Sequence, residues 1–386
     1  MRILFISAHA FLPSERKTSV HFVSEALAER GHSVATISVG YSLLTRFKDR
    51  NLYRRLVSKQ KNRFEERTPR YRSACYIPLI HPFSSKSPRL NRAMSPFFRL
   101  YGNVLPRFMT REIKAANAVV LETGTGICFF DTIRRINPKA RIFYFDRDRL
   151  DTVGALPYLI QLEQRIAPSF DRVFVPSPRM AEHLPPGTKV RYVPQGIDKY
   201  SFDRCETSPY PAGSRNAIIV GNMLFDDAAV SAMAQRNPGV AFHLFGGGMR
   251  GDFPSNVIIY GEQPFGDIIP YVKFADFGVA PYRITERELY LAASSLKLQL
   301  YSYCLLPILA PDLLAGTRDN LVVYRQSGED DWANIVDLAL KADRTPLWRD
   351  GILSWDEVAA QIEADLAGSN AARATEMDFL AASCPA

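Results

Sequence analysis

The segment "RNAIIVGNMLFDDAAVSAMAQRNPGVAFHLFGGG", residues 215–248, carries the clearest structural signal in the chain. It reads as an apolar strand, a loop that contains a glycine, a helix, a second strand and a glycine-rich loop. This spacing predicts two parallel strands joined by a crossover helix. Three later apolar runs continue the alternation: "NVIIYGE" (256–262), "FGVAPY" (277–282) and "LPILA" (306–310).

The N-terminal half alternates in the same way. Its short apolar runs include "RILFISAH" (2–9), "ANAVVLETG" (116–124), "ARIFYFDRD" (140–148) and "DRVFVPSP" (171–178). We therefore expect an α/β protein with two doubly wound, Rossmann-like domains, residues 1–203 and 204–353, that face a cleft. Ligands in such sheets bind at the carboxyl ends of the strands. A predicted helix opens the segment 354–386, which we expect to cross back to the first domain.

The first residues predict a strand rather than a signal peptide, because Ser7 and His9 interrupt the apolar run. No window approaches the 18 uninterrupted apolar residues of a membrane-spanning helix. The five cysteines include no CxxC pair, so neither a structural zinc site nor a disulfide framework is expected. These features together predict a cytoplasmic chain.

Positive charge is concentrated in the first third of the 386-residue chain, whose net charge is +8. Residues 1–114 hold 22 Lys and Arg against 7 Asp and Glu, and the remainder holds 26 against 33. The region 45–113 combines this charge with aromatic residues, which suits an anionic membrane surface. Two alternatives have the same composition: a surface that binds nucleic acid, and a solvated face that covers a stripe of core residues. We favour the membrane surface and no nucleic acid, because the chain contains no recognised nucleic-acid module.

The most specific local pattern is "LAASSLKLQLYSYCL", residues 291–305. A helix that begins near Ser294 has unpaired N–H groups and a partial positive charge at its start. Ser294 or Ser295 can cap this helix or donate to phosphate oxygens, and Lys297 adds a full positive charge. The pattern predicts a diphosphate site. The alternative is a capped helix whose lysine reaches solvent.

Two glycine loops and one acidic loop add weaker signals. "FGGGMRG" (245–251) and "VGNMLFD" (220–226) let a ligand approach the backbone, although ordinary turns explain both equally well. Asp146, Asp148 and Asp151 follow a predicted strand, and one of them can serve as a general base. Asp146 and Asp151 can instead be solvated loop charges that pair with neighbouring arginines.

Taken in order, several motifs identify a family. They include "SAH" (7–9), "VHF" (20–22), "GNMLFD" (221–226), "NVIIYGE", "FGVAPY" and "YLAASSLKLQLY" (290–301). In these the chain resembles the two-domain GT-B glycosyltransferases and, within them, the GumK family of membrane-associated glucuronosyltransferases of xanthan synthesis.

The resemblance implies a reaction and a set of site residues. The reaction is an inverting, metal-independent transfer of glucuronic acid from UDP-glucuronate to a polyprenyl-diphosphate-linked oligosaccharide, at the cytoplasmic face of the inner membrane, with no cofactor. The family's catalytic base falls on Asp148. Its nucleotide-binding positions fall on Met223, Glu262, Tyr282, Ser294, Ser295 and Lys297. There are two alternatives: a glycosyltransferase of the same fold that uses another UDP-sugar donor, and a UDP-sugar 2-epimerase of similar architecture.

The chain departs from the family pattern near these positions. The family's "ASD" at the base reads "DRD" here, which adds Asp146 and Arg147. Ala293 stands where the family has Asp, Leu300 where it has Gln, and Gln263 where it has Met. These differences concern the fit of the uridine and the sugar more than the class of reaction.

Overall fold

The computed structural model describes residues 1–12, 17–84, 87–247, 251–326 and 330–368, and these form two compact units. Unit 1 comprises most of the chain up to Pro194 and the chain from Asp356 onward, and unit 2 runs from Gln195 to Trp355. Residues 248–250 of the glycine loop and 369–386 of the expected C-terminal segment lie outside the described residues.

The N-terminal part of unit 1 ends at Pro194, before the expected domain boundary at residue 203, because the segment that links the two units packs on unit 2. Strand β9 (Gly196–Ile197) pairs with β16 (Leu353–Ser354). Helix α8 (Lys199–Arg204) follows, and its Phe202 ring lies 6.1 Å from that of Phe265. The Lys273 ammonium donates a hydrogen bond to the Phe202 carbonyl.

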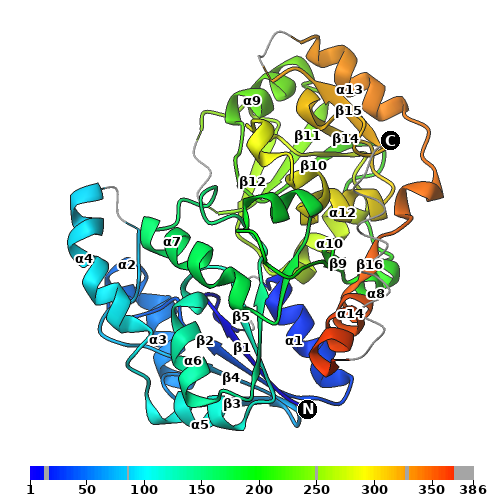
Figure 1. Ribbon diagram of the computed structural model, residues 1–386. Helices are drawn as coiled ribbons and strands as arrows, with labels where there is room; N and C mark the ends of the chain where they lie inside the picture. The colour runs from blue at the N-terminus through cyan, green and yellow to red at the C-terminus, as the bar shows by residue number, and fades with distance from the viewer. Residues whose placement is uncertain (13–16, 85–86, 248–250, 327–329, 369–386) are drawn as a thin grey trace. The chain divides into compact units, whose positions relative to one another are not determined.

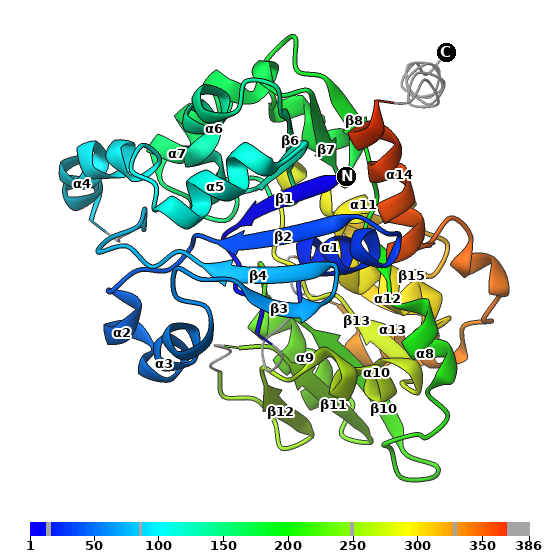
Figure 2. The same ribbon diagram turned by 90° about the horizontal axis from the view of Figure 1, so that it is seen from below.

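Unit 1 contains an eight-stranded sheet in the order β3-β4-β2-β1-β5-β6-β7-β8. Its strands are β1 (Arg2–Ser7), β2 (Ser33–Ser38), β3 (Glu65–Thr68), β4 (Tyr71–Cys75), β5 (Ala118–Glu122), β6 (Arg141–Phe145), β7 (Arg172–Val175) and β8 (Val190–Tyr192). All neighbours pair in parallel except β3, which is antiparallel to β4 at the edge, as Figure 2 shows. The central strands are buried along their length, which is why they read as continuous apolar runs.

Helices connect these strands. They are α1 (Ser19–Glu29), α2 (Thr45–Lys48), α3 (Arg50–Lys59), α4 (Pro88–Tyr101), α5 (Arg107–Ala115), α6 (Phe130–Ile136), α7 (Pro157–Ile166) and the 3-10 turns η1 (Thr125–Phe129), η2 (Ala167–Ser169) and η3 (Pro178–His183). Helix α4 lies at the periphery of unit 1 in Figure 1.

The last described helix, α14 (Trp355–Ala367), returns to unit 1 as expected and lies beside α1 in Figure 1. Glu363 pairs with Arg30 at 2.7 Å and with His32 at 2.7 Å. Asp365, 2% exposed in its side chain, pairs with Arg191 and lies 3.5 Å from Arg172. These contacts fix the helix against the amino ends of the strands, away from their carboxyl ends.

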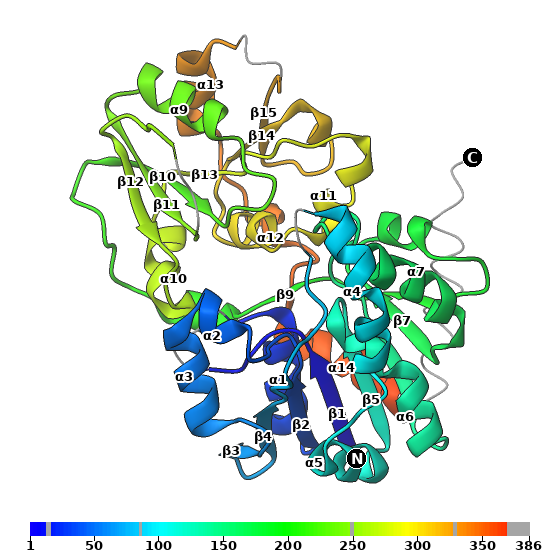
Figure 3. The ribbon, with the colours of Figure 1, turned by 90° about the vertical axis from the view of Figure 1, so that its left-hand side faces the viewer.

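Unit 2 contains a six-stranded parallel sheet in the order β12-β11-β10-β13-β14-β15 (Figure 3). The strands are β10 (Arg215–Val220), β11 (Val240–Phe245), β12 (Val257–Gly261), β13 (Phe277–Val279), β14 (Ile308–Pro311) and β15 (Leu321–Tyr324). The helices are α9 (Asp227–Arg236), α10 (Phe265–Lys273), α11 (Leu291–Ser294), α12 (Leu296–Tyr303) and α13 (Trp332–Lys341), with 3-10 turns η4 (Glu286–Glu288), η5 (Asp312–Leu314) and η6 (Pro346–Arg349). Ile219, Phe242, Phe277 and Leu309 are fully buried in its core.

Within the described residues, every helix is too short or too polar to cross a membrane.

Candidate active site

The strand order of unit 2 locates its binding edge. The order 3-2-1-4-5-6 reverses direction between β10 and β13, and ligands bind at such a switch point, outside the carboxyl ends of the strands. Gly221 follows β10 directly, and Tyr282 comes shortly after β13. The predicted nucleotide-binding residues in these loops therefore lie at the edge of the sheet where this fold binds ligands.

Helix α12 is packed tightly against the sheet through a glycine. A Cβ atom at Gly278 of β13 would lie 2.4 Å from the Tyr301 ring, so only glycine lets the ring reach the strand. The Tyr301 hydroxyl accepts a hydrogen bond from the Val220 N–H at 2.9 Å. This bond ties α12 to the carboxyl end of β10 and fixes the direction in which the helix begins.

The two serines take different positions. Ser294 ends α11, and α12 begins at Leu296 with Ser295, one of the two predicted capping residues, as its N-cap. The Ser295 hydroxyl accepts a long contact of 3.5 Å from the Leu298 N–H. It is also hydrogen-bonded to the Tyr282 hydroxyl at 2.6 Å. Both serines are 6% exposed, so Ser295 is the capping residue and is held by Tyr282.

Lys297 points back over the turn after β10. Its ammonium lies 4.6 Å from the centre of the Tyr282 ring, a cation–π distance. Gly221 has φ of +79°, and a Cβ atom there would lie 3.9 Å from Lys297 Cε. Burial raises the pKa of Tyr282, so its phenol stays neutral beside the ammonium. The structure thus brings together Lys297, Tyr282, Ser295 and Gly221.

Met223 and Glu262 lie on the loops around this group. Met223 is 36% exposed in the turn after Gly221. Glu262 is exposed, and its Oε2 atom would be 3.4 Å from a Cβ atom at Gly247. The Asn222 side chain donates to the Gly247 carbonyl. Asn222 therefore links the Gly221 turn to the loop beside Glu262, a role that the sequence did not indicate.

The three departures from the family pattern that lie in unit 2 make local contacts. The Ala293 carbonyl accepts from the Gln299 amide at 3.4 Å, and Leu300 is buried at 3% exposure. The Gln263 amide donates to the Tyr260 carbonyl at 2.8 Å. Leu300 thus packs in the interior, whereas Gln299 bonds to the backbone just before the two serines.

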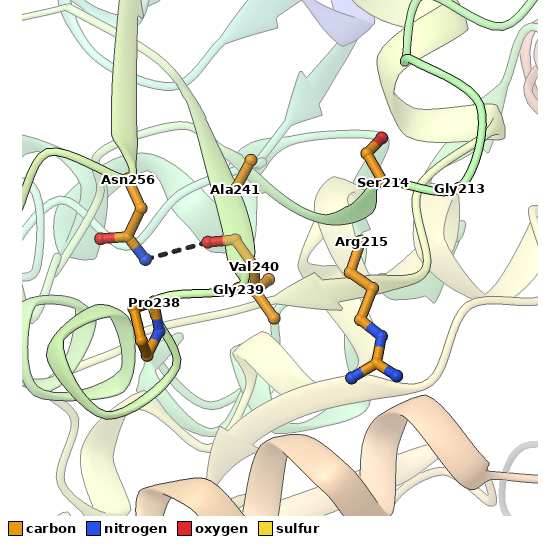
Figure 4. Close-up of a pocket in the computed structure, with 8 residues that line it drawn as sticks. All are labelled: Gly213, Ser214, Arg215, Pro238, Gly239, Val240, Ala241 and Asn256. Atoms are coloured by element: carbon orange, nitrogen blue, oxygen red, sulfur yellow. Dashed lines mark hydrogen bonds between the residues drawn. The ribbon is translucent and has the colours of Figure 1, made fainter.

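A hollow of about 460 Å³ lies at the opposite edge of the same sheet, where Arg215 begins β10 and Val240 begins β11 (Figure 4). The Asn256 side chain closes one side by donating to the Val240 carbonyl at 2.9 Å. Because this hollow lies at the amino ends of the strands, it is not where the fold binds nucleotides.

In unit 1, half-buried Asp148 lies in the loop after β6. Glu122, at the carboxyl end of β5, accepts a hydrogen bond from the Ser7 hydroxyl at the end of β1. Burial raises the pKa of Glu122, and the Asp148 charge raises it further, whereas His9, Ser7 and Arg147 oppose the shift. Asp148 is therefore close enough to interact electrostatically with a buried carboxyl group at the switch point of this sheet.

The interpretation of Asp146 as a solvated loop charge is wrong. Asp146 is fully buried, because its N–H donates to the Phe174 carbonyl and extends the β6–β7 ladder by one residue. Arg147 is 4% exposed and donates to the Val193 carbonyl at 3.1 Å. Burial lowers the pKa of Arg147 to about 10, against the raising effect of the carboxylates, so it stays cationic at neutral pH. Asp151 does pair with Arg149, at 2.8 Å.

The basic, aromatic region divides into core and surface. On α4, Phe98 and Tyr101 are buried, whereas Phe97 (56%) and Leu100 (59%) are exposed. Leu90, two helical turns before Phe97 on α4, is also exposed, at 44%, and so is Val104, at 66%, which follows the end of the helix. We call Leu90, Phe97, Leu100 and Val104 the α4 patch. It is an apolar surface on a segment that also carries exposed Arg89 and Arg99.

Two sheets with this strand order, and a terminal helix that returns to unit 1, define the GT-B fold. The fold resembles that of Anabaena HepE in complex with UDP and glucose, with a TM-score of 0.63, 12% identity, and coverage of 95% of this chain and 100% of that one. It also resembles a UDP-forming α,α-trehalose-phosphate synthase from Burkholderia xenovorans, with a TM-score of 0.56, 12% identity, and coverage of 95% and 100%.

The sequence comparisons identify the family. The family "Glucuronosyltransferase GumK, N-terminal domain" matches residues 5–176. The UDP-glucuronate:glycolipid 2-beta-glucuronosyltransferase of Xanthomonas campestris pv. campestris is 30% identical over 363 residues, which cover 93% of this chain and 88% of that protein. The chain belongs to the GumK glucuronosyltransferase family and is a glycosyltransferase.

Proposed function

We propose that the protein transfers glucuronic acid from UDP-glucuronate to a polyprenyl-diphosphate-linked oligosaccharide, with inversion at C1 and without a metal ion at the diphosphate. The observation that carries the proposal is Lys297, held over the Gly221 turn by Tyr282 at the start of α12. The activity in the relative's name, on UDP-glucuronate and a glycolipid, supports the donor and the class of acceptor.

Unit 2 binds the donor in this proposal. The leaving UDP gains negative charge as the bond to C1 breaks, and preorganised donors stabilise such a charge most effectively. Lys297 supplies a full positive charge, and the N–H groups of α12 supply a partial one. Ser294 lies beside this helix start, and Met223 and Glu262 line the approach to the nucleotide. This set of donors does for the diphosphate what a divalent cation does in other transferases.

Unit 1 supplies the base. Asp148 removes the proton from an acceptor hydroxyl while that oxygen attacks C1 of the donor. The Arg147 charge and the Glu122 carboxyl group interact with Asp148, so its environment contains both signs of charge. A single displacement with one base inverts C1, and the β product in the relative's name agrees with attack on an α-linked sugar nucleotide.

The α4 patch holds the enzyme at the cytoplasmic face of the inner membrane as a peripheral protein. Its exposed apolar side chains insert among the lipids, and the basic residues of region 45–113 attract anionic headgroups. This placement brings the enzyme to an acceptor that is itself anchored in the lipid.

A different UDP-sugar is the alternative donor, because Ala293 and Leu300 differ from the family pattern near the donor site. A panel of UDP-glucuronate, UDP-glucose, UDP-galactose and UDP-N-acetylglucosamine, each incubated with purified enzyme and lipid-linked acceptor extracted from membranes, separates them by product mass. We expect a product that has gained one hexuronic acid residue, and only from UDP-glucuronate. A hexose product would refute the donor assignment, and conversion of the donor without acceptor would indicate a 2-epimerase.

A further inference from the structure

Two buried carboxylates and one half-buried histidine converge near the turn that carries Asp148. Asp146 follows β6, Glu163 lies on α7 and His183 ends η3. One donor atom from each lies within 4.8 Å of the others. The His183 Nε2 atom is 3.5 Å from Asp146 Oδ2 and 3.7 Å from Glu163 Oε2. Three separate elements of unit 1 thus direct nitrogen and oxygen atoms at one point.

These distances do not fit direct hydrogen bonds. A hydrogen bond between a ring nitrogen and a carboxylate oxygen is about 2.7–3.2 Å long. Among the described residues, Asp146 Oδ2 and His183 Nε2 are buried without a hydrogen-bond partner. Ligands about 2.0–2.2 Å from a metal ion in a tetrahedral site lie roughly 3.3–3.6 Å from each other. The His183–Asp146 separation of 3.5 Å falls within this range, and the His183–Glu163 separation of 3.7 Å lies just above it.

The second oxygen atoms of the two carboxylates are held by neighbours. Thr123 Oγ1 donates to Asp146 Oδ1 at 3.2 Å, and the Tyr144 hydroxyl donates to Glu163 Oε1 at 2.5 Å. Partners of this kind orient metal ligands in proteins and leave one oxygen atom of each carboxylate for the ion. The Gln164 amide donates to the His183 main-chain carbonyl at 2.8 Å, and both ring nitrogens of His183 are buried without a hydrogen-bond partner among the described residues.

Charge and donor type indicate which ion fits. Two carboxylates buried at 0% and 2% side-chain exposure are costly to ionise; the Arg147 charge offsets part of this cost for Asp146, and a divalent cation with a neutral imidazole supplies the remaining balance. Magnesium and calcium prefer oxygen ligands only, whereas zinc accepts mixed nitrogen and oxygen donors. The His183 side chain is 11% exposed, so an ion has a short path from solvent.

We infer that Asp146 Oδ2, Glu163 Oε2 and His183 Nε2 bind one first-row divalent metal ion of the Zn²⁺ class. The ion joins β6, α7 and η3 and anchors the turn that ends in Asp148. This inference goes beyond the proposed function, since the site belongs to unit 1 and takes no part in diphosphate binding.

Metal content of the tag-free, full-length protein tests the inference. The protein is stripped with a chelator, reloaded with Zn²⁺, freed of excess metal by gel filtration and analysed by elemental mass spectrometry. We expect one Zn²⁺ per chain in the wild type and close to none in Asp146→Ala. Asp151→Ala is the matched control, because it removes a carboxylate from the same loop that pairs with Arg149. It should retain one Zn²⁺.

Cobalt substitution identifies the ligands. Co²⁺ in this site should give the visible absorption of a tetrahedral nitrogen and oxygen site, which Glu163→Gln should abolish even if Asp146→Ala fails to fold. Thiolate-to-cobalt absorption in the near ultraviolet would instead assign the metal to cysteines and overturn the inference. Retention of equal Zn²⁺ by the wild type and by folded Asp146→Ala would also overturn it. So would a wild type that binds neither ion, because the three residues would then form a proton-sharing cluster.

Discussion

Replacement of Lys297 by alanine should weaken UDP binding severely. The ammonium is half-buried and already positioned, 4.6 Å from the centre of the Tyr282 ring, so little ordering is needed when the diphosphate arrives. A charge-assisted hydrogen bond of this kind contributes about 1.5–3 kcal/mol. At about 1.4 kcal/mol per tenfold change, the Kd for UDP should rise roughly 10- to 150-fold. Isothermal titration calorimetry with purified protein measures this change directly.

The control for this experiment is Lys341→Ala. Lys341 lies on α13 of the same unit, is 74% exposed in its side chain and pairs with Asp337. Its replacement removes the same charge from unit 2 without touching the β10–β13 edge, so the Kd for UDP should stay within about twofold of the wild-type value. If Lys297→Ala also stayed within this range, the diphosphate would not contact Lys297 and the proposed donor site would be wrong.

Three further results are expected. The Kd for UDP should be the same with excess EDTA and with added Mg²⁺, whereas tighter binding with Mg²⁺ in calorimetry would contradict a metal-independent diphosphate site. Leu100→Glu should reduce binding to anionic vesicles in a sedimentation assay, whereas Leu338→Glu, which alters a leucine on unit 2 of similar exposure (50% against 59%), should not. Burial alone would raise the pKa of Glu363, but hydrogen bonds from Arg30 and His32 hold it below the usual 4.5. The ionised Glu363 carboxylate therefore stabilises the fold above about pH 4.5, and this stabilisation is lost as the pH falls and the carboxylate is protonated. Glu363→Gln should therefore lower the free energy of unfolding by roughly 0.2–1 kcal/mol near pH 7, with the difference closing in acid; a difference that persists in acid urea titrations would rule this out.

Much of the fold could be predicted from the sequence because buried parallel strands read as continuous apolar runs. The same applies to the start of α12, since serine is a preferred N-cap and leaves a local signal. The return of α14 to unit 1 followed from the fold class. The bonds that fix it, from Arg30 and Arg191 to residues far along the chain, could not be read from local patterns.

Contacts between loops were the part that the sequence could not supply. Asn222, in the loop after β10, donates to the Gly247 carbonyl in the loop after β11, and no spacing rule connects these two residues. The burial of Asp146 depends on one additional backbone bond between β6 and β7, which turns an apparent loop charge into an interior one. On α4, the helical period separates exposed Phe97 from buried Phe98, whereas the composition of region 45–113 did not distinguish surface aromatic residues from core ones.

The central claim is that Asp148 removes the proton during transfer to a lipid-linked acceptor. Its most direct test is single-turnover transfer of glucuronate from UDP-glucuronate by Asp148→Asn, beside the wild type and Asp151→Asn, with the Kd for UDP measured on each protein. The account predicts a rate lowered by roughly 10²- to 10⁴-fold for Asp148→Asn alone, with unchanged UDP affinity. A near-normal rate in that variant would contradict it.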